Sequence, residues 1–166
     1  MNVQVYDVGA GTWGDLQEVT TGVSDLTARG VDVAYESTSG DALVVFCDGD
    51  ADPGYYVWNG ATWTGPSPIN LGSANNCEYI KLASNPASDE IVLVARDTGT
   101  QYEAQVWDGS AWGNSVVLGS VNQVAHEGMA VEYEESGNQA MVTVSNGTNA
   151  NFAWAAWDSD TDQWST

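Results

Sequence analysis

The sequence predicts an all-β fold built from repeated antiparallel sheets, and three observations support this prediction. A short motif that ends in tryptophan occurs four times, and an apolar element occurs three times between its copies. No segment has a sustained helical period of apolar residues. The closing tryptophans Trp13, Trp63, Trp112 and Trp164 are 50, 49 and 52 residues apart. This constant interval indicates one structural unit used several times.

The tryptophan motif is typical of a β-hairpin. In each copy an aromatic residue and an Asp or Asn precede a short turn rich in Gly or Asp, which the closing Trp follows. Asn59-Gly60 and Asp108-Gly109 are dipeptides that favour tight turns between antiparallel strands. The four copies are Tyr6–Trp13, Trp58–Trp63, Trp107–Trp112 and Trp157–Trp164.

The element between the motifs predicts two further strands, because a polar break separates two apolar runs in each copy. The two elements together make a unit of four antiparallel strands. The copies of the apolar element are Val31–Gly49, Ile80–Gly99 and Met129–Gly147. The strands expected in the first unit are Val31–Glu36, Ala42–Cys47, Tyr55–Trp58 and Thr62–Ile69.

The second strand of each unit is apolar on both faces. In the first unit the residues that alternate between the faces are Ala42, Leu43, Val44, Val45, Phe46 and Cys47. In a two-layer sandwich one face of such a strand would meet water and carry polar residues. Strands buried on both faces suit sheets stacked around an axis, so the sequence predicts a β-propeller of four-stranded antiparallel blades.

The repeat count predicts a single repeat domain over residues 1–166 with about three and a half blades. A half blade spans 2–20, and blades span 30–70, 77–118 and 127–166. Propellers usually need at least four blades to close. We therefore expect oligomerisation to complete the ring, with a homo-oligomer for which a dimer is the first expectation. A portion of a longer propeller is the alternative.

The turn motif resembles the Asp-box of sialidase-type propellers, in which an Asp, a Gly and a closing Trp join the third and fourth strands of a blade. Asp7, Gly9 and Trp13 fit this pattern loosely, and the next two copies are shorter versions. The Trp-Asp pairs at 107–108 and 157–158 resemble WD repeats, but the Gly-His pair of that family is absent, so this is not a true WD repeat protein. Repeat size and aromatic content are similar to those of tryptophan-rich propeller lectins. That resemblance implies carbohydrate binding.

Catalysis is not expected. The sialidase resemblance would imply three arginines that clamp a substrate carboxylate and a tyrosine nucleophile, but the chain contains only Arg29 and Arg96. His126 is the only histidine, and no Ser or Cys lies in a recognisable nucleophile elbow. Paired carboxylates for glycoside hydrolysis stay open in so acidic a chain, although nothing in the sequence selects a pair.

The charge of the chain limits its partners. It has 23 acidic and 3 basic residues, and this balance argues against nucleic acid, whose phosphates need clustered Lys and Arg. No apolar stretch has the length that membrane insertion requires. Such acidity suits a salty or extracellular setting, so we expect an extracellular or cell-surface protein. The N-terminus lacks the pattern of a signal peptide, and prior removal of one from a longer precursor stays open.

Calcium is the one metal that the sequence suggests. Asp48, Asp50 and Asp52 place carboxylates at alternate positions of one loop, as oxygen ligands of a hard cation can be placed. Pro53 stands where an EF-type loop needs Gly, which favours the alternative of a solvated acidic turn. No other cofactor is expected.

The loops that enter the first strand of each unit share one propeller face and differ between the units. They carry the predicted ligand-binding residues Arg29, Glu78, Tyr79, His126 and Glu127. Loops on a rigid scaffold often carry binding, so this face is the candidate site, with sequence drift in a solvent loop as the alternative.

These observations predict a non-catalytic binding module, with a glycan as the suggested ligand. The alternative is a purely structural or assembly unit without a ligand. The recurring tryptophans could stack on sugar rings, but their regularity favours blade packing. Cys47 and Cys77 lie on neighbouring units near the same face, and two separate thiols are favoured over a disulfide.

Overall fold

The computed structural model describes residues 1–22, 28–120, 127–136, 138–146 and 151–166. These residues form fourteen strands and no helix, so the all-β prediction is confirmed. The same residues accordingly contain no helix that is long and apolar enough to cross a membrane.

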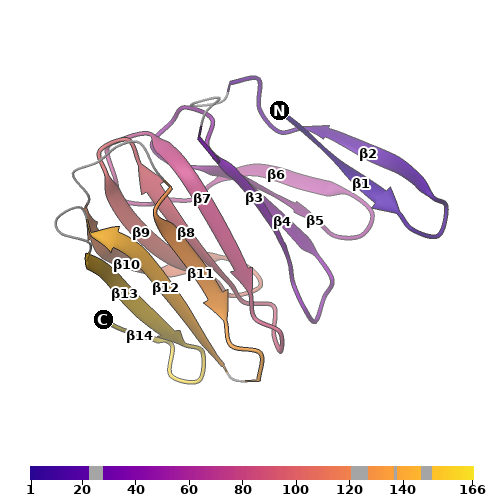
Figure 1. Ribbon diagram of the computed structural model, residues 1–166. Coiled ribbons are helices and arrows are strands. Elements are labelled where there is room, and N and C mark those ends of the chain that lie inside the picture. Colours follow the sequence, from indigo (N-terminus) through magenta and orange to yellow (C-terminus); the bar gives the residue numbers. More distant parts are fainter. Residues whose placement is uncertain (23–27, 121–126, 137, 147–150) are drawn as a thin grey trace.

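The strands form one two-stranded sheet and three four-stranded sheets, each antiparallel and in sequence order (Figure 1). The N-terminal sheet contains β1 (Asn2–Asp7) and β2 (Thr12–Glu18). The first four-stranded sheet contains β3 (Val31–Tyr35), β4 (Ala42–Phe46), β5 (Gly54–Trp58) and β6 (Trp63–Pro68). The second contains β7 (Cys77–Ser84), β8 (Ile91–Asp97), β9 (Gln101–Trp107) and β10 (Trp112–Ser120). The third contains β11 (Met129–Tyr133), β12 (Gln139–Asn146), β13 (Asn151–Asp158) and β14 (Gln163–Ser165).

The N-terminal hairpin corresponds to the third and fourth strands of the other sheets. In each hairpin an aromatic residue at or next to the end of the first strand contacts a Trp at or next to the start of the second, with ring centroids 5.1 to 5.6 Å apart. The four pairs are Tyr6–Trp13, Trp58–Trp63, Trp107–Trp112 and Trp157–Trp164. The repeat seen in the sequence is therefore one contact geometry built four times.

Each motif closes its own turn through its Asp or Asn side chain. The backbone amides of Ser110 and Ala111 both donate to Asp108 Oδ1 at 2.8 Å. The Ser110 hydroxyl also donates to this oxygen at 2.7 Å, and it lowers the pKa of the Asp108 carboxyl. The equivalent acceptors in the other copies are Asp7, Asn59 and Asp158. These bonds lie within the hairpin, so the turn needs no help from neighbouring sheets.

The apolar core lies between the sheets, as the two-faced strands predict. β4 and β8 are buried along their whole length. The core between the first and second sheets includes Leu43, Val45, Ile80, Leu93 and Trp107. The core between the second and third includes Val92, Val94, Val131, Val142 and Trp157. The first strands β3, β7 and β11 lie side by side at the centre of the arc.

Two tryptophans also connect neighbouring sheets through hydrogen bonds of their indole nitrogens. Trp63 Nε1 donates to the carbonyl of Asp15 at 2.8 Å, and Trp164 Nε1 donates to the carbonyl of Asn114 at 2.5 Å. Each acceptor lies two residues after the closing Trp of the preceding motif and has a left-handed φ of 50°. Trp112 Nε1, by contrast, is buried and has no hydrogen-bond partner among the described residues.

Cys47 and Cys77 form a disulfide, so the expectation of two separate thiols is wrong. Their Cα atoms are 5.3 Å apart, within the range that a disulfide spans. The Cys77 amide donates to the Asp50 carbonyl at 2.9 Å, which draws the start of β7 toward the loop after β4. A Cβ on Gly30 would lie 3.2 Å from Cys47 Cβ, so Gly30 permits the close approach of the chain there. The bridge ties the first sheet to the second.

Candidate functional site

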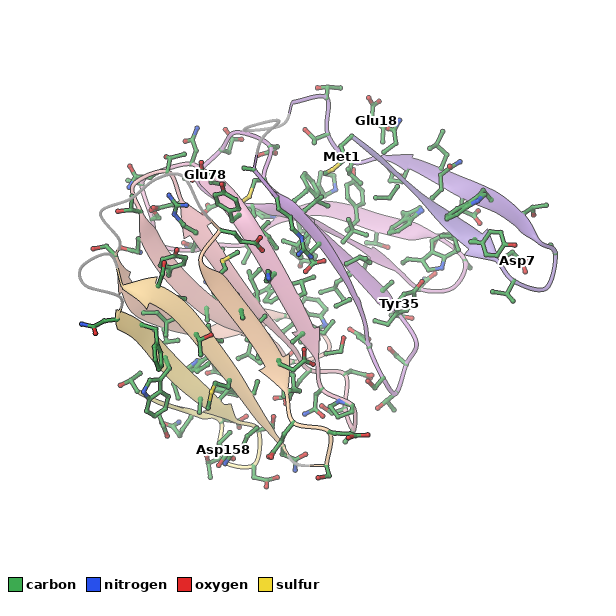
Figure 2. All side chains as sticks on the ribbon, viewed as in Figure 1. Met1, Asp7, Glu18, Tyr35, Glu78 and Asp158 are labelled. Carbon is green, nitrogen blue, oxygen red and sulfur yellow. A yellow bond between two sulfur atoms is a disulfide. The ribbon has the colours of Figure 1, made fainter. Side chains whose placement is uncertain are left out.

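The structure brings four of the five predicted ligand-binding residues to one end of the sheets. Arg29, Glu78, Tyr79 and Glu127 lie where the chain enters β3, β7 and β11, while His126 lies outside the described residues. Figure 2 shows Glu78 at this end and Asp158, in a turn of the third sheet, at the opposite end.

Ion pairs connect the three four-stranded sheets at this end. Glu127 Oε1 lies 3.2 Å from Lys81 Nζ and 3.8 Å from an Arg29 guanidinium nitrogen. A second guanidinium nitrogen of Arg29 donates to Asp32 Oδ1 at 3.1 Å. The other oxygen of Asp32 accepts the amide of Leu82 at 3.0 Å, which fixes the carboxylate on the neighbouring sheet.

A second ion pair at the same end is buried. The Arg96 side chain is fully covered, and its guanidinium lies 3.4 Å from Glu78 Oε2 and 5.2 Å from the centre of the Tyr79 ring. The Tyr102 hydroxyl donates to the Glu127 carbonyl at 3.1 Å and so connects the second sheet to the entry of the third. Arg96 thus combines an ion pair with a cation–π contact.

These ion pairs, which we call the end-face network, contain every basic residue of the chain. Arg29, Lys81 and Arg96 are the only Lys or Arg residues, and each is paired with a carboxylate. Sequence reasoning selected Arg29 and missed Lys81, Arg96 and Asp32. The available signal was position, because Lys81 lies within the first strand of its sheet and Arg96 near the end of the second, where it pairs with Tyr79, two residues before Lys81.

The end-face network presents fixed donors and acceptors to solvent. Half of the Arg29 side chain and about a third of the Lys81 and Glu127 side chains are exposed. Charged groups held in place make stronger hydrogen bonds than neutral ones, and the paired charges offset one another. Such a surface suits a neutral ligand with several hydroxyl groups better than a highly charged one.

The predicted calcium loop does not form a ligand set. Asp48 Oδ1 accepts the amide of Asp50 at 3.2 Å, and Asp52 Oδ1 accepts the amide of Leu71 at 3.3 Å. Within the described ranges, no three His, Cys, Asp or Glu side chains are grouped so that they could hold a metal ion. The three carboxylates order their own loop, and calcium binding there stays a prediction without a formed site.

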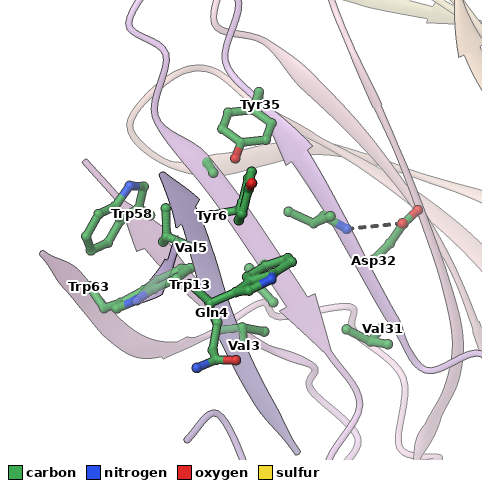
Figure 3. A pocket seen from close by; sticks show the side chains of 13 residues that line it. Val3, Gln4, Val5, Tyr6, Trp13, Val31, Asp32, Tyr35, Trp58 and Trp63 are labelled. Carbon is green, nitrogen blue, oxygen red and sulfur yellow. Dashed lines mark hydrogen bonds between the residues drawn. The ribbon is translucent and has the colours of Figure 1, made fainter. Parts of the chain in front are cut away.

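An apolar groove of about 510 Å³ lies between the N-terminal hairpin and the first four-stranded sheet (Figure 3). Its aromatic residues are Tyr6, Trp13, Tyr35, Trp58 and Trp63. Tyr6 is 48% exposed, whereas Trp58, which has the same place in its own motif pair, is 8% exposed. The sequence analysis did not identify this groove. The available signal was the half unit at residues 2–20, which is too short to cover the sheet of the next unit.

A buried carboxylate lies on the outer part of the second sheet. Burial raises the pKa of Glu103, and the nearby carboxylates of Asp97 and Asp52 raise it further. Gln105 Nε2 donates to Glu103 Oε1 at 3.3 Å, and this bond lowers the pKa in part. Gln105 also donates to the Asn70 carbonyl. The pair lines a small polar pocket beside Trp112.

Comparison with solved structures finds a similar fold in part of a sialidase. The NanB sialidase from Streptococcus pneumoniae, solved with 2-[(3-chlorobenzyl)ammonio]ethanesulfonate, is similar with a TM-score of 0.58 and 10% identity over 93% of this chain. A second NanB structure, with Optactamide, has a TM-score of 0.50 and 12% identity over 89% of this chain. This chain spans 26% of NanB in both.

The α-L-arabinofuranosidase PaAbf62A from Podospora anserina, solved with cellotriose, has a TM-score of 0.47 and 14% identity over 81% of this chain and 48% of its own. No protein-family model matches the sequence. No curated protein is similar to it in sequence. At these identities the likeness to NanB shows the fold alone, and it confirms the predicted architecture of propeller-type four-stranded sheets.

Proposed function

We propose that this chain is a non-catalytic binding module that holds a carbohydrate at the end-face network. The observation that carries this proposal is the gathering of all three basic residues at one end of β3, β7 and β11. In a chain with a net charge of −20, all three Lys and Arg residues lie here, each beside a carboxylate. The ligand would lie across the three four-stranded sheets, at the entries of β3, β7 and β11.

Sugar chemistry fits this surface. Neighbouring hydroxyl groups of a sugar both donate and accept, so they pair well with a carboxylate beside a guanidinium or ammonium group. The side chains of Arg29 and Glu127 are exposed enough to be reached, and their ion pairs keep them in place before a ligand arrives. Preorganised side chains lose less conformational freedom on binding, which favours affinity.

Two further observations support a binding role outside the cell. The Cys47–Cys77 disulfide is consistent with an oxidising, extracellular compartment. The chain lacks the third arginine that sialidase chemistry would require, which supports binding without catalysis.

The test is a glycan array with the wild-type chain, with and without millimolar calcium, followed by titration calorimetry on the best ligand. We expect Glu127→Gln to weaken binding at least about 10-fold, because it removes a charged partner of the ligand and of both Lys81 and Arg29. Glu135→Gln is the matched control, since Glu135 follows the opposite end of β11 and is exposed. Failure of the wild-type chain to bind any glycan, or equal affinity in both variants, would contradict the proposal.

An assembly role is the second candidate, because the N-terminal sheet has two strands among the described residues and borders an open apolar groove. In this role the chain forms a homo-oligomer, first a dimer, that extends the arc toward a ring. Light scattering at micromolar concentration measures this directly. A solution mass of 17.6 kDa, that of a single chain, would argue against it.

A further inference from the structure

The third strand of the second sheet buries a carboxylate and an amide. Glu103 and Gln105 are 6% and 5% exposed, and they share a face of β9 with Trp107, which packs against the first sheet. The corresponding residues of the other four-stranded sheets, counted back from Trp58 and Trp157, carry no charge. They are Gly54 and Tyr56 in β5, and Ala153 and Ala155 in β13. The buried polar pair is therefore a local departure from the repeat.

The surroundings of Glu103 supply no positive charge. No described Lys or Arg forms an ion pair with it, and the three that the chain contains lie in the end-face network. Burial and, to a smaller extent, the carboxylates of Asp97 and Asp52 raise its pKa. A buried carboxylate without a counter-charge costs free energy. A cation bound beside Glu103 would offset this cost.

A pocket of about 330 Å³ opens beside the buried pair. It lies between β9, the start of β10 and the segment that follows β6, and Asn70, Asn114 and Ser115 line it together with Glu103 and Gln105. None of the residues of the end-face network lines it. A pocket of this volume suits a small molecule.

The polar groups of the pocket are held in place. Gln105 Nε2 donates to the Asn70 carbonyl and, at 3.3 Å, to Glu103 Oε1. Asp52 Oδ1 accepts the amide of Leu71 at 3.3 Å, and this bond holds the segment after β6. Glu103 Oε2 and Gln105 Oε1 accept no hydrogen bond from the described residues. The pocket thus offers two free acceptors, and its lining residues include no charged donor.

The neighbouring carboxylate of Asp97 is already occupied by hydrogen bonds. Its Oδ1 accepts the amide of Gln101 at 2.8 Å, and its Oδ2 accepts from the Ser73 hydroxyl and the Asn75 side-chain amide. Over the described ranges no three acidic, His or Cys side chains are grouped as a metal site would require. An ammonium group needs only acceptors around its three N–H bonds, so the pocket favours an organic cation over a metal ion.

We infer that this pocket binds a small organic molecule through a primary ammonium group. The ammonium donates to Glu103 Oε2 and Gln105 Oε1, and the rest of the ligand extends past Asn114 and Ser115, which are exposed. The net charge of −20 attracts such a cation from solution. A free amine and a lysine side chain present the same group. This inference goes beyond the proposed carbohydrate site and uses none of its residues.

The test is an NMR titration of the whole, isotope-labelled chain with aminopentanol at about pH 7, where an aliphatic amine is protonated. We expect the side-chain amide signal of Gln105 to move as the amine binds. Pentanediol has the same length and no charge, and it should bind at least about 10-fold more weakly. Added salt should weaken binding of aminopentanol, because it screens the attraction between the charges.

A third probe distinguishes the two sources of the ammonium group. Acetyl-lysinamide carries the side chain of lysine between amide groups, as a protein does. Tighter binding of acetyl-lysinamide than of aminopentanol assigns the pocket to lysine side chains of a partner. Equal or tighter binding of aminopentanol assigns it to free amines, and both outcomes support the inference.

Two matched variants test which carboxylate holds the amine. Glu103→Gln should weaken binding of aminopentanol at least about 10-fold, because it removes the charged acceptor and keeps the shape of the side chain. Glu132→Gln removes the same charge from an exposed position on β11, so it measures the loss of long-range attraction alone. We expect Glu132→Gln to bind almost as the wild-type chain does.

The inference is overturned if aminopentanol does not bind, if pentanediol binds equally well, or if the two glutamate variants have equal affinity. It is also overturned if millimolar calcium displaces the amine, or if the signals that move belong to the end-face network rather than to Gln105. Loss of glycan binding at the end-face network would leave all of these outcomes unchanged, so the two proposals fail separately.

Discussion

The same aromatic pair lies in two different environments at the two ends of this molecule. In the third sheet Trp157 pairs with Trp164 and is fully buried, because the second sheet packs against it. In the N-terminal sheet Tyr6 pairs with Trp13 at nearly the same ring distance, but both rings are largely exposed. The geometry of the pair is therefore local, whereas its burial depends on whether a complete sheet stands beside it.

This difference shows that the hairpin forms its own turn, whereas burial of its aromatic rings depends on the neighbouring sheet. The turn is closed by side-chain oxygens within a few residues, and it forms alike in the open and the filled environments. Burial of the aromatic rings requires strands that are far away in sequence. The motif should thus fold similarly everywhere but contribute to stability only where neighbouring strands cover it.

The largest expected difference is between Trp107→Ala and Trp13→Ala. Trp107 is buried, and its Nε1 donates to Glu36 Oε1 at 2.5 Å, so its loss should lower the free energy of unfolding by about 3–5 kcal/mol. Trp13→Ala should change it by no more than about 0.5 kcal/mol, because the ring is exposed. Chemical denaturation of both variants measures this. An equally large loss at Trp13 would show that its ring is covered in solution.

The Cys47–Cys77 disulfide links the first and second four-stranded sheets, whose contact is buried. Replacing Cys47 and Cys77 together by Ala should lower the free energy of unfolding by about 3–4 kcal/mol, because the bridge closes a loop over a sequence separation of 30. Reductant should destabilise the wild-type chain and leave the double variant unchanged. Two reactive thiols in the denatured, unreduced chain would contradict the bridge.

Loss of the indole hydrogen bond between sheets should lower the free energy of unfolding by a smaller amount. Trp164→Phe removes a hydrogen bond to Asn114, whereas Trp112→Phe removes an indole nitrogen that no described residue accepts from. The cost of Trp164→Phe should exceed that of Trp112→Phe by about 0.5–1.5 kcal/mol. Thermal or chemical denaturation of the two variants tests this. Equal costs would mean that the Trp164 bond contributes nothing net.

The smallest effect concerns pH. Burial raises the pKa of Glu103 above its ordinary value of 4.5. The protonated carboxyl therefore adds its full contribution to the free energy of unfolding below pH 4.5. This contribution is lost as the pH rises through the pKa of the folded state. Glu103→Gln should therefore be more stable than the wild-type chain at neutral pH, and the difference should disappear under acidic conditions. A stability difference that does not change between about pH 3.5 and about pH 7 would contradict this.

Much of the fold could be predicted from the sequence because its signals are local. The strands expected in the first unit agree with β3 to β6 within one residue at each end. Turn dipeptides act within four residues, and alternation of apolar residues acts along a single strand. The conclusion that β4 and β8 are buried on both faces followed from their composition alone.

The sequence by itself determined the repeat, the strands and the face on which Arg29, Glu78, Tyr79 and Glu127 lie. Only the tertiary structure decided that Lys81 and Arg96 join them, that Cys47 meets Cys77, and that β1 borders an open groove. The physical reason is that these contacts cross from one sheet to the next. The distances between these residues depend on how closely neighbouring sheets pack, and the residue pattern of a single strand does not determine that packing distance.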